Sequence, residues 1–219
     1  MYSFTEENYL KAILHLCDAN EKGASTNAIA QKLDAKAASV TEMLKKLSDK
    51  KLLNYKKYQG VKLTETGKKV AIATVRKHRL WEVFLVNKLE FGWEEVHEIA
   101  EQLEHIQSTK LTDKLDAFLA YPKYDPHGDP IPNKAGIFPN RSDQTLTEIE
   151  PHEIAILRGV KDTSAEFLKY LKKLELGLGE ELKVLEKEAY DHSMQVQLGN
   201  KKILNLSQQV SSNLFVTKK

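Results

Sequence analysis

The sequence predicts a mainly α-helical protein that ends in a small β domain. Apolar residues recur at helical spacing through most of the first 120 residues. Five of the six prolines then fall between Tyr121 and Asn140, where neither a regular helix nor a central strand can persist. Short β-prone runs separated by turns follow. These observations divide the chain into four expected segments: residues 1–70, 71–121, 122–144 and 145–219.

The composition is typical of a soluble globular protein. Of the 219 residues, 41% are hydrophobic and 29% are charged. No run approaches the roughly 18–20 apolar residues that span a bilayer, and the first residues, MYSFTEENYL, lack the features of a secretion signal. We therefore expect a cytoplasmic protein without membrane contact. The single cysteine, Cys17, excludes an intramolecular disulfide, and its apolar neighbours indicate a buried structural thiol.

Positive charge is concentrated in one stretch of the chain. Residues 36–80 hold eleven lysines and two arginines against three acidic residues, a net charge of +10, although the whole chain carries only +2. The remainder is therefore acidic. A basic block in an otherwise acidic protein indicates a surface that binds a polyanion, whereas a shorter lysine-rich run is usually a solvated face.

Three helices are expected before the first strand. The first covers residues 5–17, with Thr5 as its capping residue and apolar side chains at helical spacing. A short second helix, TNAIAQKL, is capped by Ser25 or Thr26. The third runs from about residue 37 to residue 50 and begins with small polar side chains. This arrangement is typical of a helix-turn-helix.

A β-hairpin is expected after the third helix. β-prone residues lie on both sides of Gln59-Gly60, and the hairpin would form a wing that carries Lys56, Lys57 and Lys62. A winged helix reads DNA with its third helix in the major groove and its wing against the phosphates. Lysines give salt-dependent affinity, and small side chains allow close approach to the bases. The expected DNA contacts are Lys36, Ala38, Ser39, Thr41, Glu42, Lys46, Lys57 and Lys62.

A longer helix is expected from about Thr66 to Leu89. Its second half is apolar on more than one face. Such an excess indicates a partner surface, and helical DNA-binding proteins commonly dimerise so that two recognition helices reach neighbouring segments of the major groove. We therefore expect a homodimer. A turn at 91–93, a fifth helix and a short helix over residues 112–120 complete this segment.

Histidines and carboxylates cluster between residues 78 and 105. They fall on two helical faces, one with His78 and Glu82 and the other with His97, Glu101, Glu104 and His105. Imidazole and carboxylate ligands without cysteine suit a divalent first-row metal ion. A solvated polar face is the usual explanation for any one such residue. The run from His97 to Glu101 half resembles the zinc-peptidase motif, but its last residue is not the required histidine.

The last 75 residues contain several short β-prone segments. We expect strands at TLTEI, IAILRGV, ELKVLEK, MQVQL, KILNL and NLFVT, and one helix from about Ser164 to Leu174. Several short strands in so small a region predict a small β-barrel. A fragment of a β-sandwich is the alternative.

With these residues in view, the chain resembles the diphtheria toxin repressor family of metal-dependent transcription regulators over its full length. SVTEMLKKLSDKKLLNYKKYQGVKLTETGKK is similar to the recognition helix and wing of the manganese-responsive branch. DPHGDPIP, residues 125–132, is similar to the sequence that leads to the family's C-terminal FeoA-like barrel. The resemblance implies a regulator rather than an enzyme: a homodimer that binds a divalent metal as co-repressor, grips a palindromic operator and represses metal-uptake genes.

The resemblance also implies a set of metal ligands. These are Glu101, Glu104 and His105 with Asn8 of the first helix for a primary site, and His78, Glu82 and His97 for an ancillary site. Glu101 stands where iron-responsive members have a cysteine. A carboxylate in place of sulfur favours a hard ion, with manganese(II) first and iron(II) next.

Several positions depart from the family pattern. Asn8 is at best a neutral oxygen ligand, and Lys11 stands where manganese-responsive members supply a second carboxylate, so their binuclear geometry cannot be reproduced unchanged. Glu7 is a candidate to compensate. Glu166 lies near the segment from which the barrel of iron-responsive members donates oxygen ligands, although a helix-surface carboxylate is the simpler interpretation.

Two other functions stay open on the sequence. In a winged-helix regulator that ignores metal, the histidines would be structural. A helical metalloenzyme that also binds nucleic acid would need an open coordination position and a separate nucleophile or base, and the sequence offers no such constellation. Titration of metal against DNA affinity separates the three.

Overall fold

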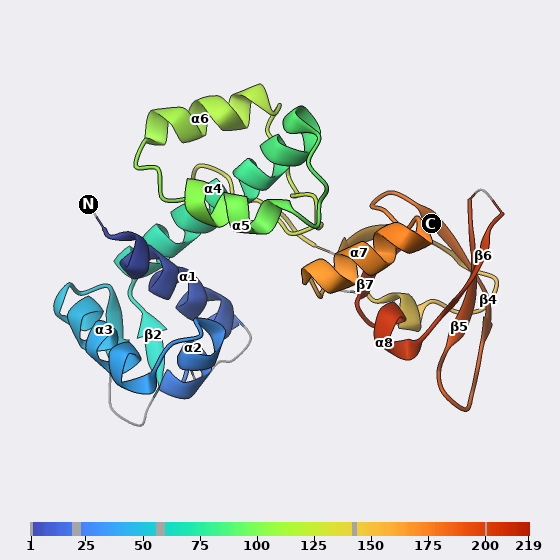
Figure 1. The fold of residues 1–219 in the computed structure, drawn as a ribbon, viewed down its shortest axis with the longest axis horizontal. Coiled ribbons are helices and arrows are strands. Elements are labelled where there is room, and N and C mark those ends of the chain that lie inside the picture. The colour runs from blue at the N-terminus through green and yellow to red at the C-terminus, as the bar shows by residue number, and fades with distance from the viewer. Residues whose placement is uncertain (1, 19–22, 56–59, 142–143, 200) are drawn as a thin grey trace.

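The computed structural model describes residues 2–18, 23–55, 60–141, 144–199 and 201–219. Figure 1 shows an elongated molecule in which helices α1 to α6 fill one half, while the β domain with α7 and α8 fills the other. The expected fold class, mainly helical with a small C-terminal β domain, is confirmed.

The helical half begins with a helix-turn-helix and a short hairpin. Its elements are α1 (Phe4–Asp18), α2 (Thr26–Lys32), α3 (Ala37–Asp49), β1 (Leu53–Tyr55) and β2 (Val61–Leu63). The strands pair antiparallel, with Asn54 opposite Lys62. Leu10, Ile29 and Leu44, one from each helix, are fully buried in a common core. Burial of this face holds the helices in place, because isolated helices of this length are marginal in water.

The first helix is capped by a different residue from the one expected. The N–H of Glu6 donates to Ser3 Oγ at 3.3 Å, and the N–H of Ser3 donates to Glu6 Oε2 at 3.1 Å. This reciprocal cap satisfies two helix-end donors at once. The prediction that Thr5 caps the helix was wrong, since Thr5 lies inside α1.

Helix α4 (Glu65–Leu89) is the spine of the helical half. α1, α5 (Val96–Leu103) and α6 (Thr109–Phe118) all pack against it. Thr64 caps its start, where the side-chain oxygen accepts a hydrogen bond from the N–H of Gly67 at 3.2 Å. Across the described part of the chain, α4 included, no helix is both long and apolar enough to cross a bilayer.

Helix α5 is shorter than the spacing of the histidines and glutamates suggested. It ends at Leu103, so Glu104 and His105 lie in the turn that follows. Glu104 keeps helical backbone angles, and its N–H donates to Ala100 O at 2.9 Å. The turn therefore keeps Glu104 facing α4, as a continued helix would have done.

The proline-rich segment packs firmly against the β domain. The N–H of Val160 donates to His127 O at 2.9 Å. Gly128 has a φ of +86°, and a Cβ at this position would lie 2.2 Å from Arg158 O and 2.4 Å from Gly159 Cα. Glycine is required here both by the left-handed backbone and by the close approach of β3.

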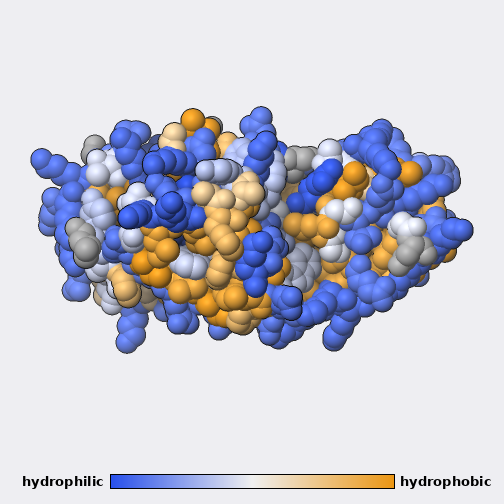
Figure 2. Space-filling model, turned by 90° about the horizontal axis from the view of Figure 1, so that it is seen from above, coloured by the Kyte–Doolittle hydropathy of each residue, from blue (hydrophilic) through white to orange (hydrophobic). Residues whose placement is uncertain are grey.

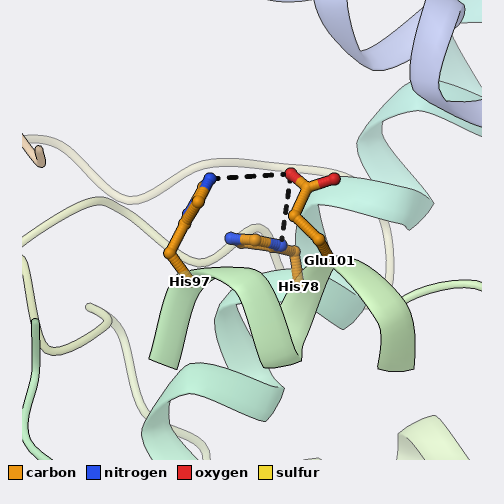
Figure 3. Close-up of side chains that lie close together, drawn as sticks. All are labelled: His78, His97 and Glu101. Carbon is orange, nitrogen blue, oxygen red and sulfur yellow. Dashed lines mark ion pairs between the residues drawn. The ribbon is translucent and has the colours of Figure 1, made fainter. Parts of the chain in front are cut away.

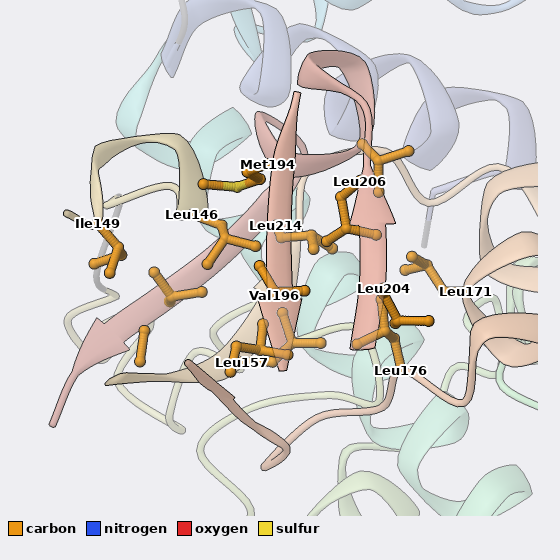
Figure 4. Packing of buried hydrophobic residues seen from close by; sticks show 14 of the residues in the cluster. Leu146, Ile149, Leu157, Leu171, Leu176, Met194, Val196, Leu204, Leu206 and Leu214 are labelled. Atoms are coloured by element: carbon orange, nitrogen blue, oxygen red, sulfur yellow. The ribbon is translucent and has the colours of Figure 1, made fainter. Parts of the chain in front are cut away.

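The C-terminal domain is built on one antiparallel sheet. Its strands are β3 (Ile154–Val160), β4 (Glu181–Lys187), β5 (Met194–Leu198), β6 (Ile203–Leu206) and β7 (Leu214–Lys218), in the order β6-β5-β4-β3-β7. Two helices, α7 (Ala165–Leu174) and α8 (Gln208–Ser211), contribute buried residues to its core. Figure 4 shows this core, in which Leu157, Val196 and Leu214 come from three different strands.

One expected strand is a 3-10 helix. TLTEI forms η1 (Leu146–Glu148), and the backbone N–H and hydroxyl of Thr145 both donate to Glu148 Oε1. A threonine followed three residues later by glutamate is a capping box, and here it outweighs the β propensity of the segment. The other expected strands and the helix over α7 are confirmed, whereas α8 was not expected.

Contacts between the two halves surround the turn before α5. Trp93 packs against the apolar core of the β domain. Glu94, whose side chain is buried, pairs with Lys172 of α7 at 2.5 Å. The β domain therefore packs against the turn that precedes α5, one of the helices that carry the histidines and carboxylates.

Glu6 ties the first helix to the third. Its buried carboxylate lies 3.1 Å from Lys46 Nζ and 2.7 Å from Lys50 Nζ, at the end of α3. Burial would raise the pKa of Glu6, but hydrogen bonds from Lys50, the Ser3 backbone and Lys46 lower this pKa to about 2. The ionised form is therefore favoured in the folded state.

We expect Glu6→Gln to lower the free energy of unfolding at pH 7 by about 1–2 kcal/mol, a modest value because the lysines are partly solvated. A carboxylate with a lowered folded-state pKa stabilises the fold above its unfolded pKa of about 4.5, and this contribution is lost as the pH falls towards 2. Urea unfolding should therefore show a smaller deficit at pH 3 than at pH 7. Glu42→Gln, on the exposed face of α3, is the control, and an equal deficit at both pH values would contradict the prediction.

Candidate metal centre

Side chains from α1, α4, α5 and the proline-rich segment meet around a cavity of about 650 Å³. The expected ligands that line it are Asn8, His78, Glu82, His97 and Glu101. The two others, Glu104 and His105, are buried beside it. The structure therefore brings all seven expected ligands into one region, although they come from separate parts of the chain.

His78 lies between two carboxylates. Its Nε2 is 3.0 Å from Glu82 Oε1, and its Nδ1 is 2.7 Å from Glu104 Oε2. Burial lowers the pKa of His78, but the contacts with Glu104 and Glu82 outweigh it and raise this pKa to about 9. At neutral pH the ring is therefore protonated and bridges the two carboxylates, and it must lose a proton before it can bind a metal.

Figure 3 shows His97 and His78 around the carboxylate of Glu101. Glu101 Oε1 is 3.7 Å from His97 Nε2 and 4.0 Å from His78 Nδ1. One ligand atom from each residue lies within 4.8 Å of the others, which is close enough for one ion to gather them. The His97 side chain is 55% exposed, so this side of the cavity is open to water.

A lysine lies among the carboxylates of the expected primary site. Lys11 Nζ is 2.5 Å from Glu101 Oε1 and 2.8 Å from each carboxylate oxygen of Glu104. The Glu104 side chain is fully buried, and that of Lys11 is 13% exposed. These two carboxylates therefore already have a cationic partner, which α1 supplies.

His105 is oriented by α1. Its Nδ1 is 2.7 Å from Glu7 Oε2, and its ring stacks on Phe4 with 4.6 Å between ring centroids. Gln107 Nε2 donates to the other Glu7 oxygen at 2.8 Å. A carboxylate on one histidine nitrogen leaves the other nitrogen free as a ligand, and His105 Nε2 lies 3.7 Å from Glu104 Oε1. Glu7 thus acts here as the orienting partner of His105.

Asn8 has an oxygen that the protein leaves without a partner. Its Oδ1 is buried and makes no hydrogen bond among the described residues. A buried acceptor in this state is destabilising and calls for an explanation. Asn8 lines the same cavity as the histidines and carboxylates, so its oxygen is suited to serve as a neutral donor to a cation.

Two buried residues that sequence reasoning did not single out complete the region. One ligand atom from each of Glu82, Asp125 and His127 lies within 4.8 Å of the others, and all three side chains are buried. Both additional residues belong to DPHGDPIP, which resembles family sequence but has no periodicity that would place its side chains. The signal in the sequence was two ionisable side chains between prolines, where a simple connection would not need them.

The ring of His127 is held in one orientation. Its Nε2 is 2.8 Å from the backbone oxygen of Trp93, and the two rings stack with 6.2 Å between centroids. Since a carbonyl can only accept, Nε2 carries a proton, and Nδ1 is left facing Glu82 Oε2 at 3.7 Å. Burial lowers the pKa of His127, but the contact with Glu82 outweighs it and raises this pKa to about 9.

Asp125 is buried beside other carboxylates on this side of the cavity. Burial and the neighbouring carboxylates of Glu82 and Asp129 raise the pKa of Asp125 to about 7, even though Arg79 lies 3.5 Å from Asp125 Oδ2. Asp125 Oδ1 also accepts from the N–H groups of His127 and Asp129, which fixes the carboxylate in place. A divalent cation bound at this site would offset the cost of ionising Asp125.

The donor set therefore fits a first-row divalent ion. It offers imidazole nitrogens and carboxylate oxygens without sulfur, a combination that suits manganese, iron or zinc. The grouped ligand atoms of Glu82, Asp125 and His127 and the unpartnered oxygen of Asn8 both favour a cation in this cavity.

The expected DNA-contacting residues that the structure describes lie on α3, just before it, or on β2. Lys36, Ala38, Ser39, Glu42, Lys46 and Lys62 are exposed. Thr41 is partly buried, and its hydroxyl donates to Ala37 O at 2.9 Å within the helix. Lys56 and Lys57 lie outside the described residues. Glu166 is exposed on α7 and is not among the residues that line the cavity, whereas Lys161 and Thr163 of the β domain are.

Three family models match consecutive parts of this chain. Residues 1–61 match the iron dependent repressor N-terminal DNA binding domain, and residues 64–133 match the iron dependent repressor metal binding and dimerisation domain. Residues 144–218 match the FeoA domain.

Two curated relatives are named as regulators. The iron-dependent repressor IdeR of Mycobacterium tuberculosis is 36% identical over 130 residues, 58% of this chain and 55% of IdeR. The HTH-type transcriptional regulator MntR of Oceanobacillus iheyensis is 36% identical over 120 residues, 54% of this chain and 80% of MntR. The chain spans about half the length of the IdeR proteins that it matches.

Solved structures agree over nearly the whole chain. A manganese-dependent transcriptional repressor in complex with manganese has a TM-score of 0.85 at 31% identity and covers 98% of this chain and 100% of its own. ScaR with bound Zn²⁺ has a TM-score of 0.76 at 34% identity and covers 98% and 99%.

Three features together define the class of metal-dependent winged-helix repressors: the winged helix-turn-helix, the cavity of histidines and carboxylates, and the C-terminal sheet. Within that class, the chain belongs to the iron-dependent repressor family, the family of the diphtheria toxin repressor, IdeR and MntR. The expected resemblance is confirmed, and these relatives are transcriptional repressors rather than enzymes.

We expect Asp125→Asn to stabilise the metal-free protein. An acid whose folded-state pKa is raised costs stability as the pH rises from its unfolded value, about 4, to its folded value of about 7. The gain in the free energy of unfolding should therefore be small near pH 4 and reach on the order of 2–4 kcal/mol above pH 7. Thermal unfolding in EDTA across this range measures it. Destabilisation at pH 8 would show that the Asp125 charge is already well compensated.

Proposed function

We propose that this chain is a homodimeric repressor whose affinity for a palindromic DNA operator rises when a divalent metal ion binds. The observation that carries the proposal is the buried cluster of Glu82, Asp125 and His127, in which α4 and the proline-rich segment present ligand atoms within 4.8 Å of one another. His97 of α5 adds a nitrogen 3.4 Å from Glu82 Oε1. One ion could thus join three segments that are distant in sequence.

Glu82, Asp125, His127 and His97 would hold the ion, with Asn8 as a neutral donor on the α1 side. A divalent ion supplies positive charge and directional ligand bonds to a region rich in buried carboxylates. The protein prepares the ligands: the Trp93 carbonyl keeps His127 Nδ1 facing the cavity, and two backbone N–H groups hold Asp125.

Contacts along the helices connect this cavity to the DNA-binding surface. α1 packs on α4, and its Lys11 and Glu7 pair with residues on or just after α5. Next to Glu7 in the first turn of α1, Glu6 pairs with Lys46 and Lys50 at the end of α3. An ion that fixes α4, α5 and α1 therefore also restricts the position of α3, so metal and DNA favour each other's binding by linkage.

We propose manganese(II) as the physiological ion, with iron(II) next. Glu82 and Asp125 supply carboxylate oxygen to the ion, and oxygen-rich sites favour hard ions. Zinc or nickel can bind more tightly in a test tube, because affinity follows the Irving–Williams order. The ion in the cell then depends on which metal is available there.

The homodimer is supported by apolar side chains on the surface. Leu89 at the end of α4 is 52% exposed, Phe118 of α6 is 63% exposed and Tyr121 is 68% exposed. Figure 2 shows apolar surface gathered over the middle of the molecule, on the side of α4 and α6. Burial of such side chains against a second copy would place two α3 helices for two half-sites of one operator.

We assign DNA binding to residues 1–70, metal binding and dimerisation to residues 71–121, and a FeoA-like domain to residues 145–219. The family matches at residues 1–61, 64–133 and 144–218 support this division. Asp125 and His127 extend the metal centre into the connecting segment, residues 122–144. Repression of metal-uptake genes in the cytoplasm is the biological role that this arrangement supports.

We expect manganese(II) to raise operator affinity at least tenfold, and Glu82→Gln to remove most of this gain because it deletes the carboxylate that faces the three imidazoles. Fluorescence anisotropy of metal-stripped protein on labelled DNA from its own promoter measures both. Glu98→Gln, an exposed glutamate on α5, is the matched control. Tight binding that ignores metal would instead identify a metal-independent winged-helix regulator.

We expect Lys62→Gln to weaken the salt dependence of DNA binding. A lysine that contacts a phosphate contributes about one unit to the slope of log affinity against log salt, because binding releases condensed counterions. Lys183→Gln, exposed on β4, should leave the slope unchanged. If Lys62→Gln also leaves it unchanged, the hairpin does not touch DNA.

A further inference from the structure

We propose that the ammonium of Lys11 takes the place of a second metal ion at Glu101 and Glu104, so that this chain binds one divalent ion per subunit, beside Glu82. The inference rests on the proposed metal-responsive function and specifies how many ions the cavity takes and where. Its basis is the position of Lys11, which the sequence alone could not give.

Lys11 is bound as a cation would be. Its Nζ contacts Glu101 Oε1 at 2.5 Å and both Glu104 oxygens at 2.8 Å. Three carboxylate oxygens thus converge on one nitrogen from two residues that share a face at the end of α5. Glu104 is fully buried, so its charge depends on partners within the protein.

An ion and the ammonium cannot share these oxygens. A first-row divalent ion binds carboxylate oxygen at about 2.0–2.2 Å, and it would have to lie where Lys11 Nζ now lies. The two positive charges of the ion would also lie beside the positive charge of the Lys11 ammonium. Lys11 would therefore have to withdraw, although its side chain is largely buried and makes all three contacts in this space.

The opposite side of the cavity differs in charge. Around Glu82, the guanidinium of Arg79 lies 3.5 Å from Asp125 and from Asp129, and the partners of the Glu82 oxygens are imidazoles, which can exchange a proton for a metal ion. No lysine contacts the Glu82 or Asp125 carboxylate among the ion pairs of the described residues. The two halves of the cavity are thus unequal: one holds an ammonium, which cannot be a metal ligand, and the other presents imidazoles, which can.

Another donor already stands beside the two carboxylates that Lys11 contacts. His105 Nε2 lies 3.7 Å from Glu104 Oε1. With Glu101 and Glu104 it makes a set of one nitrogen and two carboxylate ligands for an ion. Removal of the Lys11 charge should therefore convert this position into a second metal site.

Metal content of the full chain tests the inference. Metal-stripped protein is dialysed to equilibrium against manganese(II), and bound manganese is counted by mass spectrometry against protein concentration. We expect one ion per subunit in the parent and in Lys11→Arg, two in Lys11→Met, and none in Glu82→Gln. Lys110→Met, an exposed lysine on α6, is the matched control and should hold one.

The outcomes separate the inference from the proposed function. Two ions in the parent, or a single ion in Lys11→Met, would overturn the role of Lys11. A parent that binds no manganese would overturn the metal-responsive function and the single ion beside Glu82, whereas uptake of one ion by Lys11→Met would then still support the role of Lys11. An ion that survives Glu82→Gln would show that the parent's site lies elsewhere in the cavity.

Thermal unfolding gives an independent readout. In EDTA, Lys11→Met should melt at a lower temperature than the parent, since Glu101 and Glu104 lose their cation, and manganese(II) should raise its melting temperature by more than it raises the parent's. Should this variant not fold in EDTA, Lys11→Met with Glu101→Gln removes one of the unpaired charges and should fold. Failure of the double variant to gain stability over the single one would overturn the argument.

Discussion

The carboxylate of Glu82 is the interaction on which the metal region depends. Its side chain is 2% exposed, and its oxygens lie 3.0–3.7 Å from imidazoles of α4, α5 and the proline-rich segment. A buried carboxylate without such partners would be strongly destabilising, and each buried imidazole likewise needs a partner for its proton. Three segments that are distant in sequence are thus positioned by one side chain. The turn at Trp93, and the β domain packed on it, follow from that arrangement.

The same cavity serves two purposes because its charges are unevenly distributed. On the α1 side, Lys11 provides a permanent link between the DNA-binding helices and α5. On the side of the proline-rich segment, burial and the carboxylates of Glu82 and Asp129 raise the pKa of Asp125 to about 7, so the protein does not fully stabilise its ionised form. The contacts of Lys11 thus hold the helices together without a metal ion, while the region around Asp125 responds to a bound cation.

Periodicity predicted much of this structure, and its limits are physical. His78 with Glu82, and His97 with Glu101, were predictable because helical geometry fixes which residues share a face. Asp125 and His127 were not, because an irregular segment has no repeat that directs its side chains. The contact of Lys11 with Glu104 depends on how α1 packs against α5, which no local pattern records. Ser3 caps the first helix, and a capping box forms η1 where β propensity predicted a strand, so capping hydrogen bonds can determine where an element begins and which kind it is.

Gly128 makes the β domain part of the metal region. Its backbone meets Arg158 and Gly159 so closely that a side chain does not fit, and next to it the His127 carbonyl accepts from Val160. A shorter descendant that lost the last domain would strip away the surface against which His127 is held. The imidazole of His127 would then lose its fixed position beside Glu82, so removal of the domain would also alter the metal site.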